Sequence, residues 1–320
     1  MWLMRGGRDQ WFETDFYTAQ PFDEGRLLKI GLLTRNQNAW CSSRLREAFL
    51  KSRVEPVCFS FSDLTAQVGM PPNMLALGNI NLVEELGAVL IRPIGRGSLD
   101  EVIFQMDALH KLSRDGLPII NHPAAIEKSV DKYYTLALLN EAGLPVPRTV
   151  VTGNVAEAVK AFEKFGGDAV VKPVFGSRGI GTARISNADV AERVFRTLRF
   201  HRHVIYVQEF VPHGTKDHRV FIVGGRVVAS MLRVSNSWKT NVSRGATPIP
   251  SKASGVVEDL ALSAAETIGC DVAGIDVLEG REGPLINELN SQPGWRGLQS
   301  TTKIDIAAEI VKHVLKKAKG

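Results

Sequence analysis

The 320-residue chain is poor in cysteine and has no long apolar run. Its three cysteines, Cys41, Cys58 and Cys270, match no metal-binding spacing and are odd in number, which is typical of reduced core thiols in a cytoplasmic protein. No apolar stretch approaches the roughly 20 residues of a membrane-spanning helix, and the first residues lack the apolar core of a signal peptide. We therefore expect a cytoplasmic protein with no disulfide framework and no membrane partner.

A strong excess of one charge is also missing. Lys and Arg number 39 against 34 Asp and Glu, a formal net charge of +5, and the basic residues are scattered along the chain. This pattern does not predict a nucleic-acid partner, whereas anionic small-molecule substrates fit it. A hydrophobic fraction of 44% and a charged fraction of 23% are ordinary for a globular protein, and the length allows two or three domains.

Two familiar nucleotide-binding motifs are absent. The first expected strand, residues 28–34, is not followed by G-x-G-x-x-G, so a dinucleotide site and a dehydrogenase are disfavoured. The Gly-rich stretch 176–181 is not followed by Gly-Lys-Ser/Thr, which excludes a P-loop. Any nucleotide site in this chain must be built in another way.

Alternating strands and helices are the main pattern that is present. Residues 1–26 mix aromatic, glycine and charged residues without periodicity, and we expect an irregular arm there. From residue 27 to residue 122, short apolar strands alternate with expected helices such as 98–112, where Ser98 and Glu101 have capping-box spacing. The pattern predicts an α/β fold that begins with a small parallel-sheet domain.

The stretch 272–296 predicts a β-hairpin with a polar face. Two apolar runs flank its Gly-rich turn. Glu288 and Asn290 are two residues apart and share a strand face, and strand pairing can bring Asp276 beside them. Such a cluster of oxygen ligands suits Mg²⁺ bound together with a substrate phosphate. The alternative is a polar strand face with one charge pair.

A Gly-rich loop follows the expected strand 169–172. Glycines let backbone N–H groups approach phosphate oxygens, and Lys172 adds a positive charge at the same place. Lys132, near the start of its helix, is another candidate phosphate contact. The alternatives are a tight structural turn for the loop and a solvated surface position for Lys132.

The stretch Gln208-Glu209-Phe210-Val211 ends an expected strand in a carboxylate followed by apolar side chains. Such a segment can hold a purine, because backbone groups pair with the edge of the base while apolar side chains cover its faces. Asp217 follows at a distance from which it can reach ribose hydroxyls. A strand that simply runs into a loop is the alternative.

Six segments, taken in order, resemble the ATP-grasp superfamily and, within it, the RimK-like amino-acid ligases. They are DKYYT, VVKPVFGSRGIG, VQEFV, KTNVSRGA, VAGIDVL and INELNSQPGW, within residues 121–320. The resemblance implies two α+β subdomains that grip ATP, residues 123–208 and 209–320, preceded by the parallel-sheet domain 27–122. It favours a ligand role over a structural one for Asp276, Glu288 and Asn290.

The resemblance also implies a role for each candidate residue. The residues implied to bind ATP are Lys132, Lys172, Gly176, Ser177, Gly179, Ile180, Gly181, Gln208, Glu209, Phe210, Val211, Asp217, Lys239 and Asn241. The Gly-rich loop would close over the phosphates as a mobile lid. The implied metal ligands would hold two Mg²⁺ ions, for which Mn²⁺ is a substitute. The implied catalytic residues are Lys172, Arg233 and Arg244.

The substrate side is expected to use arginines. Arg92 and Arg96 directly follow an expected strand, where α/β domains place ligand contacts, so they fit an acidic substrate as well as an ordinary surface position. With Arg219 and Arg244 they form the candidate substrate set. Many relatives have a second glycine where this chain has Ala246, so the resemblance constrains the geometry less closely at that point.

The implied reaction has two steps. A substrate carboxylate attacks the γ-phosphate of ATP to give an acyl phosphate and ADP, and an amine then displaces phosphate to form an amide. The segment IRPIGRGSLDEVIFQMDAL is more loosely similar to the branch that adds glutamate to tetrahydromethanopterin and related C1 coenzymes. That similarity favours addition of L-glutamate to a small coenzyme or peptide-like acceptor.

Other functions stay open at this point. One alternative is a ligase that modifies a protein C-terminus or a carrier-linked amino acid. Another, of a different class, is a non-catalytic nucleotide-binding protein. Assembly into a homo-oligomer is also left open.

Overall fold

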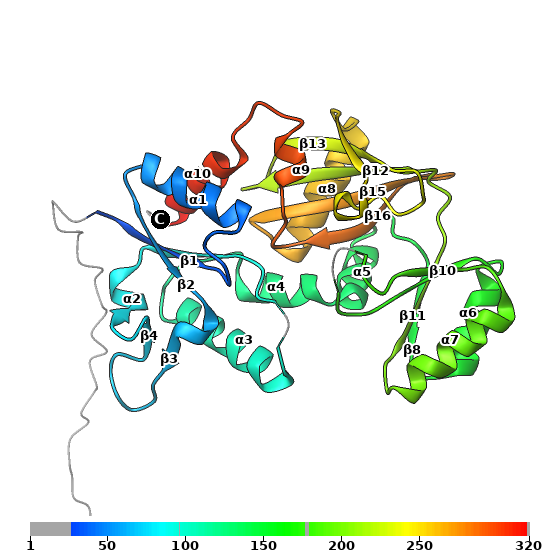
Figure 1. Ribbon diagram of the computed structural model, residues 1–320, viewed down its shortest axis with the longest axis horizontal. Helices are drawn as coiled ribbons and strands as arrows, with labels where there is room; N and C mark the ends of the chain where they lie inside the picture. The colour runs from blue at the N-terminus through cyan, green and yellow to red at the C-terminus, as the bar shows by residue number, and fades with distance from the viewer. Residues whose placement is uncertain (1–26, 96, 177–178, 319–320) are drawn as a thin grey trace, which may run out of the picture.

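A computed structural model describes residues 27–95, 97–176 and 179–318, and Figure 1 shows their arrangement. The chain forms three main sheets. They are a parallel sheet near the N-terminus, an antiparallel sheet from the middle of the sequence, which we call the central sheet, and a larger antiparallel sheet near the C-terminus. None of the described helices has the length and apolar run needed to cross a membrane. The three cysteines form no disulfide.

The N-terminal sheet has the strand order β2-β1-β6-β7, and its neighbouring strands are parallel. Its strands are β1 (Lys29–Leu33), β2 (Glu55–Phe59), β6 (Ala88–Ile91) and β7 (Ile119–Ile120). The helices of this part are α1 (Trp40–Lys51), α2 (Leu82–Glu85) and α3 (Leu99–Arg114), and η1 (Phe61–Asp63) is a 3₁₀ turn. The predicted parallel sheet and the Ser98–Glu101 capping box are both confirmed.

A small antiparallel sheet lies beside the parallel one, and the sequence pattern did not predict it. It consists of β3 (Leu64–Ala66), β4 (Met74–Ala76) and β5 (Ile80–Asn81). These strands have three, three and two residues, which is too short for a period-2 pattern to stand out from the surrounding loop.

The central sheet has the order β10-β9-β11-β8 and is antiparallel. Its strands are β8 (Thr149–Thr152), β9 (Ala169–Lys172), β10 (Ala183–Ile185) and β11 (Ile205–Glu209), and α6 (Val155–Lys164) and α7 (Ala188–Phe200) pack on it. The side chain of Asn154 accepts a hydrogen bond from Ala156 N at the start of α6. Phe162 and Phe195 fill the core between the helices and the sheet.

The C-terminal sheet has the order β14-β13-β12-β15-β16, and all its neighbouring strands are antiparallel. Its strands are β12 (Lys216–Val223), β13 (Arg226–Val234), β14 (Thr247–Pro250), β15 (Val272–Gly280) and β16 (Gly283–Asn290). The remaining elements are α4 (Pro123–Val130), α5 (Lys132–Glu141), η2 (Val242–Arg244), α8 (Gly255–Ile268), α9 (Arg296–Gln299) and α10 (Ile306–Ala318). The predicted hairpin at 272–296 is confirmed as β15 and β16.

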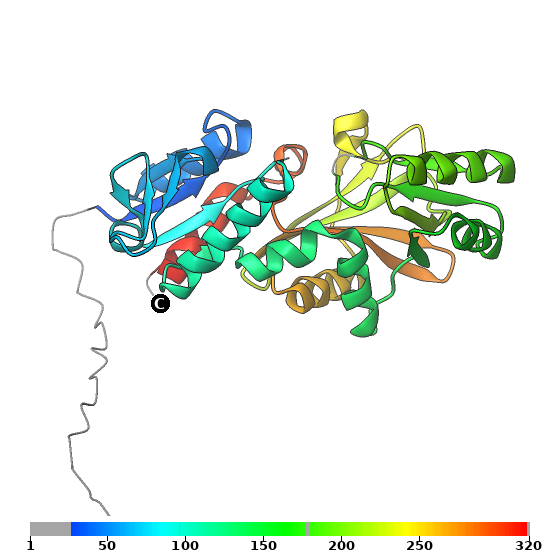
Figure 2. The ribbon, with the colours of Figure 1, turned by 90° about the horizontal axis from the view of Figure 1, so that it is seen from below.

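Hydrophobic cores join parts of the chain that are far apart in sequence. The last helix, α10, packs against α1 and the N-terminal sheet, and Figures 1 and 2 both show the red C-terminal helix there. Helices α4 and α5 pack with α8 against the C-terminal sheet, where Leu139 and Ile275 are fully buried. The predicted domain boundaries were 27–122, 123–208 and 209–320. One hydrophobic core contains residues of the first and third of these segments, and another contains residues of the second and third. The division stays a prediction.

Candidate active site

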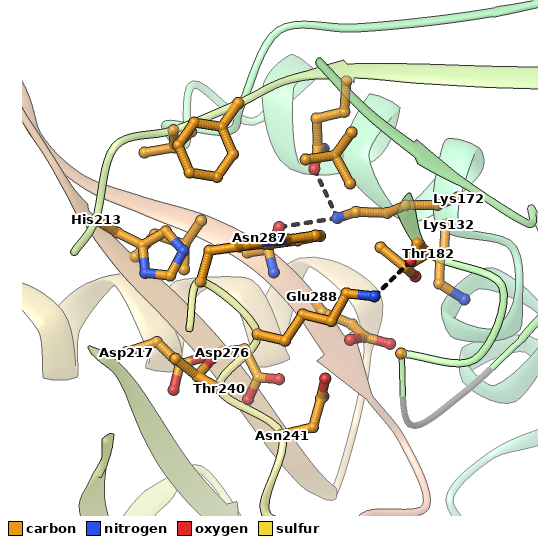
Figure 3. Close-up of a pocket in the computed structure, with 18 of the residues that line it drawn as sticks. Lys132, Lys172, Thr182, His213, Asp217, Thr240, Asn241, Asp276, Asn287 and Glu288 are labelled. Carbon is orange, nitrogen blue, oxygen red and sulfur yellow. Dashed lines mark hydrogen bonds between the residues drawn. The ribbon is translucent and has the colours of Figure 1, made fainter. Parts of the chain in front are cut away.

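A cavity of about 870 Å³, including space open to solvent, lies between the central sheet and the C-terminal sheet. Figure 3 shows side chains from both sheets pointing into it. It is lined by fifteen of the residues predicted from the sequence, namely Lys132, Lys172, Gly176, Gly179, Ile180, Gln208, Glu209, Phe210, Val211, Asp217, Arg233, Lys239, Asn241, Asp276 and Glu288. Pockets of this size commonly hold small-molecule ligands.

The acidic end of the cavity comes from the β15–β16 pair. Asp276 lies opposite Glu288 in the register, as the hairpin prediction required. The register shifts just after this pair, so that Val277 pairs with Ile286 and Asn287 is the extra residue. This β-bulge breaks the strict alternation of faces, and Asn287 and Glu288 both line the cavity. Asn290, which pairs with Gly274, is not among the lining residues.

Asp276 is buried and lies between two arginines. Its Oδ1 is 3.0 Å from Arg219 Nε, and its Oδ2 is 2.9 Å from Arg233 Nη2. Arg233 also binds both carboxylate oxygens of Asp217, which accepts a further 2.7 Å hydrogen bond from Thr240. Burial would lower the pKa of Arg233, but Asp276 and Asp217 hold it above its usual value. Burial raises the pKa of Asp217 even though Arg233 opposes the shift.

Glu288 contrasts with Asp276. Within the part of the chain that the structure describes, its carboxylate makes no hydrogen bond and no ion pair. The same described residues contain no group of three or more His, Cys, Asp and Glu side chains that could hold a metal ion. A site at this hairpin would therefore have two carboxylates, which suits Mg²⁺, because that ion takes much of its coordination from water and phosphate.

Lys172, at the end of β9, crosses the cavity to the hairpin. Its Nζ donates to Gln208 Oε1 at 2.6 Å and to Asn287 Oδ1 at 3.0 Å, and Figure 3 shows both bonds as dashed lines. Burial lowers the pKa of Lys172 to about 8, opposed by Glu288 and reinforced by Lys132. A cation held by two neutral oxygens can add a phosphate oxygen as a partner without first losing a carboxylate.

Three cations donate to main-chain carbonyls of the Gly-rich loop. Lys132 donates to Gly176 O, Arg244 to Gly179 O at 3.0 Å and Lys239 to Thr182 O at 2.7 Å. Burial lowers the pKa of Lys132, while Glu288 opposes that shift. The loop and these cations are therefore already in contact on one side of the cavity.

Gly179 packs closely against the opposite wall. Its φ of +65° lies in the left-handed region, and a Cβ there would be 2.6 Å from Asn241 Oδ1. The backbone conformation therefore favours glycine at this position, and a larger residue would displace the Asn241 side chain. Gly181 also has a positive φ, +76°, but is not among the lining residues. Ser177 lies outside the described residues.

The other end of the cavity is apolar and aromatic. The Phe210 ring has the Arg184 guanidinium 3.5 Å from its centroid and makes a T-shaped contact with Trp238, with 6.0 Å between the ring centroids. The Glu209 carboxylate is bound by Arg148, through Arg148 Nε at 2.6 Å and Arg148 N at 2.8 Å. Since its carboxylate is already paired, Glu209 would contact a purine base chiefly through its backbone, as the sequence predicts for this segment.

The predicted substrate arginines lie in different places. Arg92 is 5% exposed, donates to Pro293 O at 3.0 Å and stacks over the Trp295 ring at 4.9 Å. Arg219 reaches Asp276 from the neighbouring strand β12, Arg244 contacts the loop, and none of the three lines the cavity. Arg96 falls outside the described residues.

Several lining residues were missed from the sequence. They are Val170, Pro173, Thr182, His213, Trp238, Thr240, Leu278 and Asn287. Asn287 is the most informative, because strict alternation places it opposite its neighbours and only the bulge turns it inward. Trp238 directly precedes Lys239, which was predicted to bind ATP, so its position in the sequence could have indicated that it lies at the same site.

Comparison with known proteins gives the family. A model of the RimK-like ATP-grasp domain matches residues 129–314, more than half of the chain. A probable α-L-glutamate ligase of Cellvibrio japonicus is 32% identical and covers 91% of this chain and 97% of its own length. A tetrahydromethanopterin:α-L-glutamate ligase of Methanosarcina acetivorans is 29% identical, covering 89% of this chain and 98% of its own.

Solved structures agree on the fold. A RimK domain ATP-grasp protein from Sphaerobacter thermophilus matches with a TM-score of 0.71 at 21% identity, over 90% of this chain and 99% of that one. The ATP-grasp ligase PsnB, solved with a phosphomimetic variant of its minimal precursor, Mg and ADP, has a TM-score of 0.70 at 21% identity, over 91% of this chain and 99% of that one. The predicted ATP-grasp fold is confirmed, and the chain belongs to the RimK-like ATP-grasp family of ligases.

Proposed function

We propose that the chain is an ADP-forming acid–amino-acid ligase of the cytoplasm that adds L-glutamate to a carboxylate of a small coenzyme or peptide-like acceptor. The relatives from Cellvibrio japonicus and Methanosarcina acetivorans, which carry α-L-glutamate ligase names, align with it over most of both chains. The observation that carries the proposal is that Lys132, Lys172 and the unpaired carboxylate of Glu288 line the same cavity. That combination suits a nucleotide phosphate bound with a divalent cation.

The described residues of the cavity fit ATP with Mg²⁺. Glu288 offers a carboxylate with no competing hydrogen bond or ion pair among those residues. Asp276 lies opposite it but would have to loosen its contacts with Arg219 or Arg233. We assign Glu288 and Asp276, with Asn290 on the same strand, to Mg²⁺. The use of two ions, with Mn²⁺ as a substitute, belongs to this proposal.

The mechanism that follows depends on positioning and charge. Lys132 and Lys172 would bind phosphate oxygens, and the aromatic end with Phe210 would hold the base. Mg²⁺ supplies further neutralisation of the phosphate charge when bound. Arg233 keeps its charge because Asp217 and Asp276 flank it, so it can stabilise negative charge that develops on the transferred group. Phosphoryl transfer needs little more from the protein than this.

Mass spectrometry of a small-molecule extract tests the proposal. The full chain is incubated with ATP, Mg²⁺, isotope-labelled L-glutamate and the extract, and a peptide with a C-terminal glutamate is added in a parallel sample. The expected result is an acceptor that gains labelled glutamyl residues, with matching release of ADP. Glu288→Gln protein serves as the control, since it should bind the same acceptor without turnover. ATP binding with no ADP release on any acceptor would instead favour the non-catalytic reading.

A further inference from the structure

The N-terminal sheet meets the segment 291–295, which follows β16, at a junction where Arg92 and Ile94 contact Pro293 and Gln292. In the order β2-β1-β6-β7 the chain reverses its direction of winding between β1 and β6. Ligands of parallel α/β sheets commonly bind where the loops after two such strands diverge. Here those loops are residues 34–39 and 92–98, and none of their described residues lines the cavity that contains Lys172.

Arg92, at the end of β6, is a buried cation without an acidic partner. It is 5% exposed, and among the described residues no carboxylate lies within ion-pair distance of it. Its contacts include the carbonyl of Pro293, at 3.0 Å, the ring of Trp295 and the side chain of Cys41. A buried charge without a counter-ion is costly, so an anion bound here would be strongly favoured.

The N-terminus of α1 adds to the positive potential at this junction. The helix begins at Trp40, and its N-cap residue, Ala39, has no side chain that can accept a hydrogen bond. Trp40 lies edge-on to Trp295, with 6.2 Å between ring centroids, and Cys41 in the same turn interacts with Arg92. The uncapped N–H groups of a helix carry partial positive charge and attract anions.

Two buried hydrogen-bond donors of the segment 291–295 have no partner. They are Nε1 of Trp295, in a side chain 1% exposed, and Nε2 of Gln292. The other polar atom of Gln292, Oε1, accepts from Ile94 N at 3.4 Å. Buried polar atoms without a partner are rare in native proteins. Both unpartnered atoms are donors, so the missing partner is an acceptor.

Arg219 connects this junction with the cavity. Its Nε lies 3.0 Å from Asp276 Oδ1, while its Nη1 is another buried donor without a partner. A Cβ built on Gly274 would lie 2.5 Å from that Nη1 and 2.9 Å from Pro293 Cβ. The guanidinium of Arg219 therefore stands between the β15–β16 hairpin and the backbone that Arg92 binds.

We propose that this junction is a carboxylate-binding subsite, in which the N-terminus of α1, Arg92 and the indole N–H of Trp295 bind a carboxylate of one of the two organic substrates. The subsite would anchor that substrate beside the hairpin, with Arg219 between the anchored carboxylate and the reacting groups. The proposal rests on the proposed function, because the same substrate reacts in the neighbouring cavity. The carboxylate belongs either to the acceptor or to the amino acid, and the test separates the two.

Calorimetry on the full chain without nucleotide tests the subsite directly. The probes are glutarate and the neutral glutaramide, which has nearly the same shape. Wild type should bind glutarate more tightly. Arg92→Lys, which keeps the charge but loses the forked donor, should weaken glutarate binding about tenfold to a hundredfold, as expected for a lost hydrogen bond to a charged group. Trp295→Phe keeps an aromatic side chain but removes the indole N–H, and it should weaken glutarate binding several-fold, whereas the exposed Arg114→Met should change nothing.

Steady-state kinetics identifies the source of the carboxylate. In Arg92→Lys protein the KM of either glutamate or the acceptor should rise by the same factor as the glutarate Kd, while the KM of ATP and kcat stay near their wild-type values. Equal binding of glutarate and glutaramide to wild type, or an unchanged Kd in Arg92→Lys and Trp295→Phe proteins, would overturn the subsite. Selective glutarate binding by a chain that never releases ADP would instead overturn the proposed function and leave the subsite standing.

Discussion

The Oδ2 atom of Asp276 lies 2.9 Å from Arg233 Nη2, at the acidic end of the cavity where a metal ion is expected. Of the two facing carboxylates, Asp276 has two arginine partners, whereas Glu288 has no hydrogen-bonding or ion-pairing partner among the described residues. The two residues should therefore respond differently to mutation, and Glu288 is the first candidate for metal contact.

Glu288→Gln should lower ADP release by about a hundredfold or more, since charge stabilisation through a metal is worth several kcal/mol. The thermal midpoint should change little, because the carboxylate has no hydrogen bond or ion pair to lose within the described chain. Mg²⁺ titrations of ADP release measure the effect. Glu282→Gln, an exposed change in the turn of the same hairpin, is the matched control, and full activity in Glu288→Gln protein would remove the metal assignment.

Lys172 should produce a basic limb in the pH profile of kcat/KM for ATP. Burial lowers its pKa to about 8, from 10.5 in the unfolded chain. The charged form that attracts phosphate is present below pH 8 and is lost above it, so kcat/KM for ATP should fall as the pH rises through about 8. Lys172→Arg, whose side chain stays charged, should flatten this limb.

The stability of the folded protein should depend on Lys172 in the opposite direction, rising with pH where kcat/KM for ATP falls. Between about pH 8 and 10.5 the unfolded lysine still binds a proton that the folded lysine has released. Stability therefore rises with pH across this window, because the cost of burying the charge disappears. Denaturant unfolding at pH 7.5 and 10, compared between wild type and Lys172→Met, checks the sign. A wild type that loses stability relative to the mutant over this range would contradict it.

Asn287→Asp should move the basic limb of the pH profile to higher pH. The substitution places a carboxylate where Asn287 Oδ1 now accepts from Lys172 at 3.0 Å. An opposite charge at that distance favours the protonated amine and raises its pKa by about one unit or more. The pH dependence of kcat/KM for ATP measures the change. An unshifted limb would mean that Lys172 is not the titrating group.

Gly179→Ala should raise the KM of ATP, whereas Gly214→Ala should not. The two glycines have nearly the same φ, +65° and +67°, so both alanines carry a similar backbone cost of about 1–2 kcal/mol. A Cβ at Gly179 would press on Asn241 Oδ1, while nothing lies within 4 Å of one at Gly214. Comparing KM with the free energy of unfolding for each variant separates the contact from the strain. Equal KM values would assign the loop no part in nucleotide binding.

Local patterns determined much of this protein. The hairpin that carries Asp276 and Glu288, the capping residues Asn154 and Ser98, and the parallel N-terminal sheet follow from strand alternation and from the preference of short polar side chains for helix ends. For the same reason the order of motifs was enough to predict the family, which the comparisons confirm. The hairpin and the helix caps depend on residues that are close in sequence, and the parallel sheet follows from the repeated alternation of short strands and helices.

Contacts between distant residues were decided only by the tertiary structure. The bulge that turns Asn287 toward Lys172 depends on how β16 pairs with β15, and the burial of Arg92 depends on Pro293 and Trp295, about two hundred positions further along the chain. No local pattern records such contacts, because packing between separate elements sets which charges are buried and which partners they meet. The sequence by itself determined the order of the candidate residues along strands and loops, and the tertiary structure decided which of them line one cavity and which are already paired.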